Sequence, residues 1–169
     1  MVTLAGRLRR GTQRAEATGT FTLETCGLSD LPALTRLHRR CFRRSLAYRL
    51  PTLFSLYVWP RSRFLVARSD GKIVGCVIGD RHAGCARVVS ICVDPAWQGR
   101  GLGARLLREI EAALPGGPMI LMVEDANAPA RRLYERHGYR ELGLSRNYYG
   151  TGRNGIWMRK ERDHISPAG

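Results

Sequence analysis

The chain has 169 residues, 44% of them hydrophobic, which is enough to bury one core, so we expect a single α/β domain. It contains no apolar run of about 18 residues or more, and it lacks the apolar stretch of a secretory signal near its start. These features exclude a membrane-spanning protein and predict a cytoplasmic one without a membrane partner.

The formal net charge is +14, from 28 basic and 14 acidic residues. Such a charge can indicate an acidic partner. All but two of the basic residues are arginine, however, alongside abundant glycine and alanine, and genome composition alone can produce that bias. The charge by itself therefore assigns no partner.

Residues 1–20 carry several arginines and little apolar periodicity, so we expect a flexible basic segment there. The folded domain is expected at 21–162, and residues 163–169 form a C-terminal tail. Alternation over 21–26 predicts a strand. Ser29 or Asp30 can cap the helix that follows, which runs to about Arg44.

That first helix has a basic face opposite an apolar one. We keep two interpretations of the basic face, a solvated polar surface and an electrostatic guide for an acidic substrate or ribosomal RNA. The basic residues are Arg36, Arg39, Arg40, Arg43 and Arg44, and the apolar ones are Leu34, Leu37 and Cys41.

A second short helix is expected after Pro51, with Leu53, Leu56 and Tyr57 on one face, and Pro60 ends it. Two apolar strands follow at 64–68 and 72–79. They are joined by Ser-Asp-Gly, in which Asp-Gly is a strong hairpin signal. A further strand is expected at 87–93, where Asp-Pro terminates it.

The second half alternates helices and strands. Apolar periodicity predicts a helix over 101–114, a buried strand over 119–123, and a helix from Asn127 or Ala128 to His137, with Gly138 as its C-terminal cap. Strands at 139–144 and 155–160 close the sequence. The predicted fold is α/β, a mixed central sheet of about six to seven strands flanked by about four helices on both faces.

The five cysteines are odd in number and lack C-x-x-C spacing, which predicts buried thiols in a reducing compartment rather than a disulfide framework or a zinc site. The four histidines are dispersed and show no ligand pairing with the cysteines, so we expect no metal. These residues are Cys26, Cys41, Cys76, Cys85 and Cys92, and His38, His82, His137 and His164.

The glycine-rich segment 98–103, Gln-Gly-Arg-Gly-Leu-Gly, comes between a strand and a helix, and this arrangement predicts an anion-binding loop. A nucleotide triphosphatase would need a Lys-Ser or Lys-Thr pair next, but Ala104 and Arg105 stand there. A dinucleotide fold would need its last two glycines three apart, whereas these glycines are spaced two apart. Both of those sites are excluded.

Three segments in order along the chain resemble the GNAT acetyltransferase superfamily, most of all its RimI-type protein N-terminal acetyltransferases. In 89–104, a strand ending in Val-Asp-Pro leads into the glycine-rich loop, which matches the family's pyrophosphate signature. Residues 127–139 read Asn-x-x-Ala-x-x-Leu-Tyr-x-x-x-Gly-Tyr, and 145–149 read Ser-Arg-Asn-Tyr-Tyr. The resemblance covers about residues 21–160 and implies the GNAT fold, with acetyl-CoA as co-substrate.

The resemblance also implies which residues hold acetyl-CoA. The main chain of one strand would run beside the pantetheine arm and place an N–H near the thioester oxygen. The loop N–H groups would bind the pyrophosphate, and the residue that opens the next helix would cap that helix or contact CoA. The strand residues are Ile91, Cys92 and Val93, the loop residues are Gly99, Arg100, Gly101, Leu102, Gly103 and Ala104, and the helix residue is Asn127.

The implied reaction is direct attack by a primary amine through a tetrahedral intermediate, with Tyr134 as the general acid that protonates the leaving thiolate. The family's usual general base, a glutamate, is replaced by Met122. Glu124, His82, a water chain and an amine that arrives neutral remain open as alternatives. Cys92 could be an acetylated nucleophile or an ordinary buried thiol.

Tyr148 and Tyr149 are expected either to wall the acceptor site or to be exposed β-residues. We expect the acceptor to be the α-amine of a protein or peptide. The alternatives are a small-molecule amine and, from another class, a non-catalytic GNAT-fold module bound to RNA or the ribosome. The protein is expected to be a monomer or homodimer.

Overall fold

A computed structural model describes residues 20–43, 46–114 and 116–162. The expected C-terminal tail, Arg44 and all but the last residue of the expected N-terminal segment lie outside these residues. In the part of the chain that is described, no helix is both long enough and apolar enough to cross a membrane.

Seven strands form one mixed sheet in the order β1-β2-β3-β4-β5-β7-β6. All neighbours are antiparallel except β4 and β5, which run parallel. The strands are β1 Thr22–Thr25, β2 Arg63–Ser69, β3 Lys72–His82, β4 Cys85–Val93, β5 Met119–Glu124, β6 Arg140–Ser145 and β7 Gly155–Lys160.

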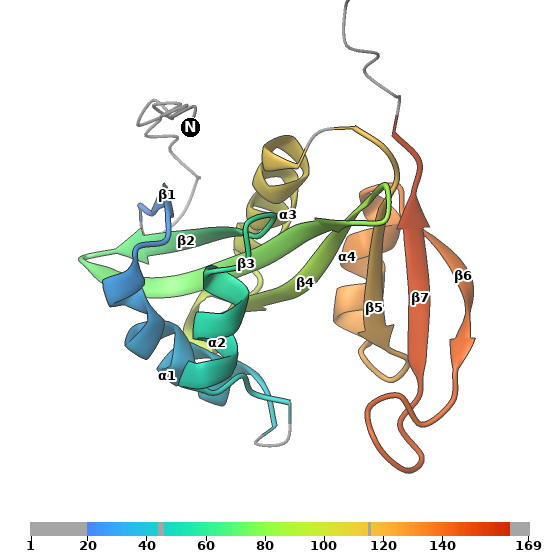
Figure 1. The fold of residues 1–169 in the computed structure, drawn as a ribbon. Helices are drawn as coiled ribbons and strands as arrows, with labels where there is room; N and C mark the ends of the chain where they lie inside the picture. Colours follow the sequence, from blue (N-terminus) through green and yellow to red (C-terminus); the bar gives the residue numbers. More distant parts are fainter. Residues whose placement is uncertain (1–19, 44–45, 115, 163–169) are drawn as a thin grey trace, which may run out of the picture.

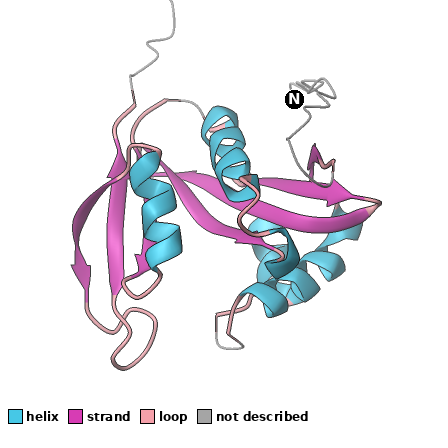
Figure 2. Ribbon diagram, turned by 180° about the vertical axis from the view of Figure 1, so that it is seen from behind, coloured by secondary structure: helices cyan, strands magenta, loops and turns pink. Residues whose placement is uncertain are grey.

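The helices cover both faces of the sheet, as Figures 1 and 2 show. On one face α1 and α2 pack on β2, β3 and β4, and on the other α3 and α4 bury a larger core that reaches β7. These helices are α1 Leu31–Cys41, α2 Leu50–Tyr57, α3 Leu102–Ala113 and α4 Ala128–Arg136, with 3-10 turns at Leu28–Asp30 and Pro95–Trp97.

The predicted element order and fold class are confirmed, and the differences are local. The first helix ends at Cys41 rather than near Arg44. Asp30 makes no side-chain cap for it; its carboxylate instead accepts the Gly27 N–H at 2.9 Å and pairs with Arg68 at 2.6 Å. The carboxylate therefore joins the turn before α1 to strand β2.

Strands β4 and β5 form a fork. They share three register pairs, from Ala86 with Met119 to Val88 with Leu121. Beyond Val88 the structure describes no further pair, although both strands continue, and Figure 1 shows their carboxyl ends diverging. In β4, Val89 has no register partner in β3, which marks a β-bulge at the start of the fork.

Candidate active site

The glycine-rich loop follows β4 at the open end of the fork. Gly99 and Gly101 both have φ of 76°, a left-handed conformation that glycine adopts without the steric penalty of a side chain. Gly101 is the N-cap of α3, and no side chain caps that helix. The first N–H groups of α3 and the positive end of its dipole therefore face the loop, as an anion site requires.

Three of the predicted phosphate-binding positions are the first residues of α3. Leu102 is buried in the core, whereas Gly103 and Ala104 are half-buried. Arg100 is exposed, and its guanidinium lies 5.1 Å from the centre of the Trp97 ring. The structure thus brings the predicted loop positions together around one helix N-terminus.

The loop is fixed to the end of β4. The Asp94 carboxylate accepts the Ala96 N–H at 3.0 Å and forms an ion pair with Arg40 at 2.8 Å. The side-chain amide of Gln98 donates to the Val93 carbonyl at 3.1 Å. Together these contacts set the position of the loop relative to the strand beside which it turns.

The three predicted strand residues place their main chain on the fork. Ile91 and Val93 pack their side chains toward the core of α3 and α4, and Cys92 turns into the core of α1. One edge of this segment pairs with β3, and the other faces the gap to β5. A contact with a ligand in the fork would therefore come from main-chain atoms.

Asn127 is the N-cap of α4, and its side-chain oxygen accepts the Ala130 N–H at 3.2 Å. This confirms the capping role that the sequence predicts. Farther along α4, Tyr134 is only 5% exposed and packs edge-on against Tyr139, with ring centres 5.8 Å apart. Burial raises the pKa of Tyr134, and Tyr149 raises it further, so the phenol keeps its proton.

Met122 and Glu124 lie on the same face of β5, because the strand continues without interruption to Glu124. Arg153 binds both carboxylate oxygens of Glu124, at 2.6 and 2.7 Å. This pairing lowers the pKa of Glu124. A carboxylate that is held in this way is a poor proton acceptor.

His82, another sequence candidate for the base, is exposed at the last position of β3. It pairs with Cys85 at the start of β4, which is the end of that strand remote from the open fork. The structure therefore contradicts a role for His82 at this site. Cys92 is buried, and its raised pKa keeps the thiol protonated, as an ordinary core thiol would be.

Aromatic residues lie on two connections near the open end of the fork. Tyr148 and Tyr149, between β6 and β7, stack edge-on with centres 4.9 Å apart, and the Tyr149 hydroxyl donates to the Met122 carbonyl at 3.1 Å. Tyr48, between α1 and α2, has its pKa raised by burial and by Tyr148. We call Tyr48, Tyr148 and Tyr149 the aromatic rim. Both connections lie at the end toward which the fork opens (Figure 1).

Sequence reasoning missed Tyr48 and Arg153. Neither residue belongs to a motif, and each reaches the site only through the packing of its connection. It also missed that His38 meets Cys76 and Cys92 in the core, at 3.7 Å from Cys76. The sequence spacing of the histidines and cysteines therefore did not reveal that these three residues meet.

Comparison with known proteins places this chain in a family. The acetyltransferase (GNAT) domain pattern matches residues 60–141. An uncharacterized N-acetyltransferase of Methanocaldococcus jannaschii is 32% identical over 139 residues, which cover 79% of this chain and 86% of that protein. The N-alpha-acetyltransferase RimI of Mycobacterium tuberculosis is 38% identical over 113 residues, which cover 60% of this chain and 68% of that protein.

A solved structure agrees with these relatives. The ribosomal-protein-S18-alanine N-acetyltransferase from Escherichia coli superposes with a TM-score of 0.76 at 30% identity, covering 88% of this chain and 96% of that chain. The agreement in sequence and fold confirms both the predicted fold and the predicted enzyme class. The chain belongs to the GNAT acetyltransferase family, and it is an N-acetyltransferase.

Proposed function

We propose that this N-acetyltransferase takes its acetyl group from acetyl-CoA and passes it to the α-amine of a protein or peptide, with residues 21–162 as the transferase domain. Two relatives support this acceptor by their names, RimI of Mycobacterium tuberculosis and the [ribosomal protein bS18]-alanine N-acetyltransferase of Salmonella typhimurium, which is 30% identical. The observation that carries the proposal is the aromatic rim, whose Tyr148 is 53% exposed. An open rim leaves room for a chain to continue past its first residue.

The fork fits acetyl-CoA on two grounds. The left-handed glycines and the helix α3 without a side-chain cap suit a pyrophosphate, with N–H groups from Gly99 to Ala104 as donors. The edge of β4 at residues 91–93 suits an extended pantetheine arm that takes the place of a strand. Asn127, at the start of α4, would stand beside the CoA. Acetyl-CoA supplies an activated thioester.

The chemistry then follows from the groups at the fork. The amine nitrogen bonds to the thioester carbonyl carbon, and a main-chain N–H of β4 stabilises the oxyanion that forms. When the oxyanion collapses, the carbon–sulfur bond breaks and the sulfur takes a proton from Tyr134. Because burial keeps Tyr134 protonated, the proton donor is available at neutral pH.

In this proposal no carboxylate acts as the base that removes a proton from the amine. Met122 cannot accept a proton, and Arg153 occupies both oxygens of Glu124. The amine therefore binds in its neutral form, and the extra proton of the product returns through water to Tyr134, which regains the proton that it gave to the sulfur. An α-amine suits this route better than a lysine side chain, because its pKa of about 8 leaves far more neutral amine at pH 7 than a pKa of about 10.4 does.

The experiment offers the full chain and acetyl-CoA a set of peptides with different first residues, the same peptides with blocked N-termini, and small amines such as polyamines, amino sugars and amino acids. Thiol release measures turnover, and mass spectrometry locates the acetyl group. We expect acetylation of unblocked N-termini only. Turnover confined to small amines or to lysine side chains would contradict the proposed acceptor, and CoA binding without turnover on any acceptor would contradict the proposal as a whole.

A further inference from the structure

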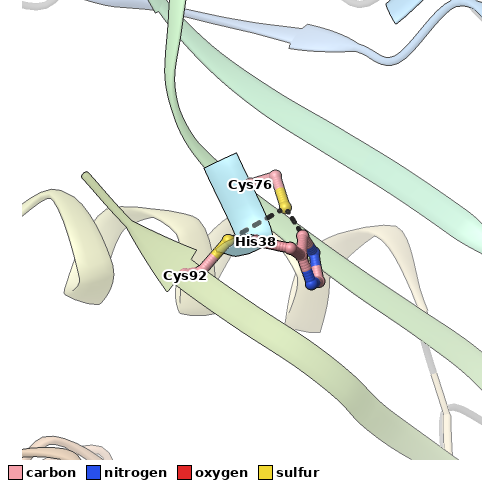
Figure 3. Close-up of side chains that lie close together, drawn as sticks. All are labelled: His38, Cys76 and Cys92. Atoms are coloured by element: carbon pink, nitrogen blue, oxygen red, sulfur yellow. Dashed lines mark hydrogen bonds between the residues drawn. The ribbon is translucent and has the colours of Figure 1, made fainter. Parts of the chain in front are cut away.

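Three side chains that can bind a metal meet in the core between α1 and the sheet (Figure 3). His38 comes from α1, Cys76 from β3 and Cys92 from β4, and all three are buried. The Cys76 sulfur lies 3.4 Å from the Cys92 sulfur and 3.7 Å from Nε2 of His38. Their ligand atoms all lie within 4.8 Å of one another.

The fold holds these residues in place through separate elements. Cys76 and Cys92 are register partners across β3 and β4. The imidazole of His38 is stacked on Tyr48, with ring centres 5.2 Å apart, and packs against Phe42 at 5.3 Å. Nδ1 of His38 has no hydrogen-bond partner among the described residues, and Nε2 is the nitrogen that points to a sulfur.

We propose that His38, Cys76 and Cys92 form a binding site for a thiophilic metal ion, Zn²⁺. Two sulfurs and an imidazole nitrogen form one of the three-ligand sets that bind zinc in proteins, with water in the fourth position. With Zn–S bonds of about 2.3 Å and a Zn–N bond of about 2.0 Å, tetrahedral geometry separates two sulfurs by about 3.8 Å and a sulfur from a nitrogen by about 3.5 Å. The two measured separations differ from these values by only a few tenths of an ångström.

Charge also suits zinc at this position. On binding, each of Cys76 and Cys92 loses its thiol proton to solvent and forms a sulfur–zinc bond, while His38 binds through a neutral nitrogen. Two thiolates balance the charge of Zn²⁺, so the core gains no net charge. Binding therefore releases two protons for each zinc ion.

Cys41 is a nearby thiol that does not belong to this group of three. It lies at the end of α1, and its thiol donates to the Val93 carbonyl at 3.3 Å. Zinc in structural sites is almost always four-coordinate. In this proposal the fourth ligand is a water molecule, because a third thiolate from Cys41 would leave the core with a net negative charge.

The test unfolds the full chain in denaturant with a thiol reductant and a chelator, and then refolds it with or without Zn²⁺. Refolding is needed because a buried site of this kind fills as the chain folds. We expect about one zinc per chain by mass spectrometry of the metal, a higher melting temperature with zinc, and release of two protons. Refolding with Co²⁺ should give the thiolate-to-metal absorption of a sulfur-ligated cobalt site. This absorption reports on the ligands without any substitution.

Cys76→Ser and Cys92→Ser should lose the zinc, whereas Cys85→Ser, at the far end of β4 from the cluster, should keep it. The proposal is overturned if the refolded chain carries no zinc and no cobalt absorption, since the thiols then only hydrogen-bond. It is equally overturned by a mass lower by two hydrogens that maps a disulfide to Cys76 and Cys92. Loss of zinc in Cys85→Ser as well would also contradict it.

Discussion

The two sides of the fork are built from different parts of the chain. On the proposed donor side, the edge of β4 and the start of α3 present main-chain groups, and the side chains of Ile91, Cys92 and Val93 turn into the two cores. On the proposed acceptor side, side chains would form the surface, with Tyr48 and Tyr148 from two connections and Met122 from β5. A donor site made of main-chain groups depends on backbone conformation, and an acceptor site made of side chains depends on residue identity.

This difference bears on how each side fits the sequence pattern of the family. A backbone site recurs wherever the glycines and the strand ending recur, so the loop 98–103 matches its family pattern. The acceptor side departs from that pattern at Met122, and Arg153 holds the neighbouring Glu124. Substitutions on each side should therefore change different kinetic constants.

The largest effect is expected from Gly101→Val on the donor side. A Cβ at this position meets nothing within 4 Å, so the cost comes from the φ of 76°, which is poorly accessible to a β-branched residue. We expect the loop to change conformation and kcat/KM to fall by about 100-fold or more, through CoA affinity. Calorimetric titration with CoA measures the change in affinity. Gly143→Ala on β6 is the control, because a Cβ at this position also meets nothing within 4 Å.

Tyr134→Phe tests the link between the two sides. It removes the proposed proton donor and keeps the buried ring, so we expect kcat to fall about 30- to 100-fold while the Kd of CoA stays within about 2-fold. Single-turnover rates measure the chemical step. Tyr139→Phe, on the ring that packs against Tyr134, is the matched control. Unchanged turnover in Tyr134→Phe would remove this residue as the acid.

Gly155→Ala should affect the acceptor side alone. A Cβ at Gly155 would overlap the Met122 side chain and come within 3.1 Å of the Tyr148 Cβ. The rim must shift, and we expect the KM for peptide to rise about 10-fold with CoA affinity unchanged. Steady-state kinetics with the preferred peptide measure it. An equal loss of CoA affinity would show that the two sides are not separable.

Met122→Glu places a carboxylate where the family pattern has one. We expect kcat/KM for peptide to rise about 5-fold at pH 6.5, because a base can then take a proton from the charged amine. The gain should disappear above the pKa of the amine, where the amine is already neutral. A pH profile beside that of Met122→Gln measures the effect. No gain at any pH would mean that amine deprotonation does not limit the rate.

The smallest effect is expected from Glu124→Gln on stability. Arg153 lowers the pKa of Glu124, so the ionised carboxylate stabilises the folded chain above its ordinary pKa, and this contribution is lost as the pH falls through the lowered value. Because solvent screens this partly exposed pair, we expect the wild type to melt only about 1–2 °C higher at pH 7. The difference should vanish in acid. A difference in melting temperature that persists in acid would show that it comes from packing and not from the ion pair.

Much of the fold could be predicted because local signals mark its boundaries. Asp70 and Gly71 both have the positive φ that their hairpin signal predicts, and Gly138 has a φ of 86° just after α4. The turn between β3 and β4 gave no such signal, although Ala83 and Gly84 there also have positive φ. An alanine in that conformation is a tertiary effect, imposed by the pairing of the two strands.

The residues of the candidate site also divide into those with a local sequence signal and those brought together by tertiary packing. The loop and Tyr134 lie in continuous patterns that resemble the family, so both could be proposed as site residues from the sequence. The pairing of Glu124 with Arg153 joins residues 29 positions apart, and that of His38 with Cys76 joins residues 38 apart. Such contacts form only when separate elements pack together, and residue spacing carries no record of them.

Strand β6 forms one edge of the sheet, and it is exposed along almost its whole length, including Leu142 at 62% and Leu144 at 56%. An apolar edge of this kind invites pairing with a strand of another copy. Leu142 has no register partner in β7, so the strand is irregular there, and Arg140 and Arg146 bracket it with charge. A second strand cannot easily pair with an edge that is kinked and charged, so the shape of β6 disfavours aggregation of the folded chain through this edge.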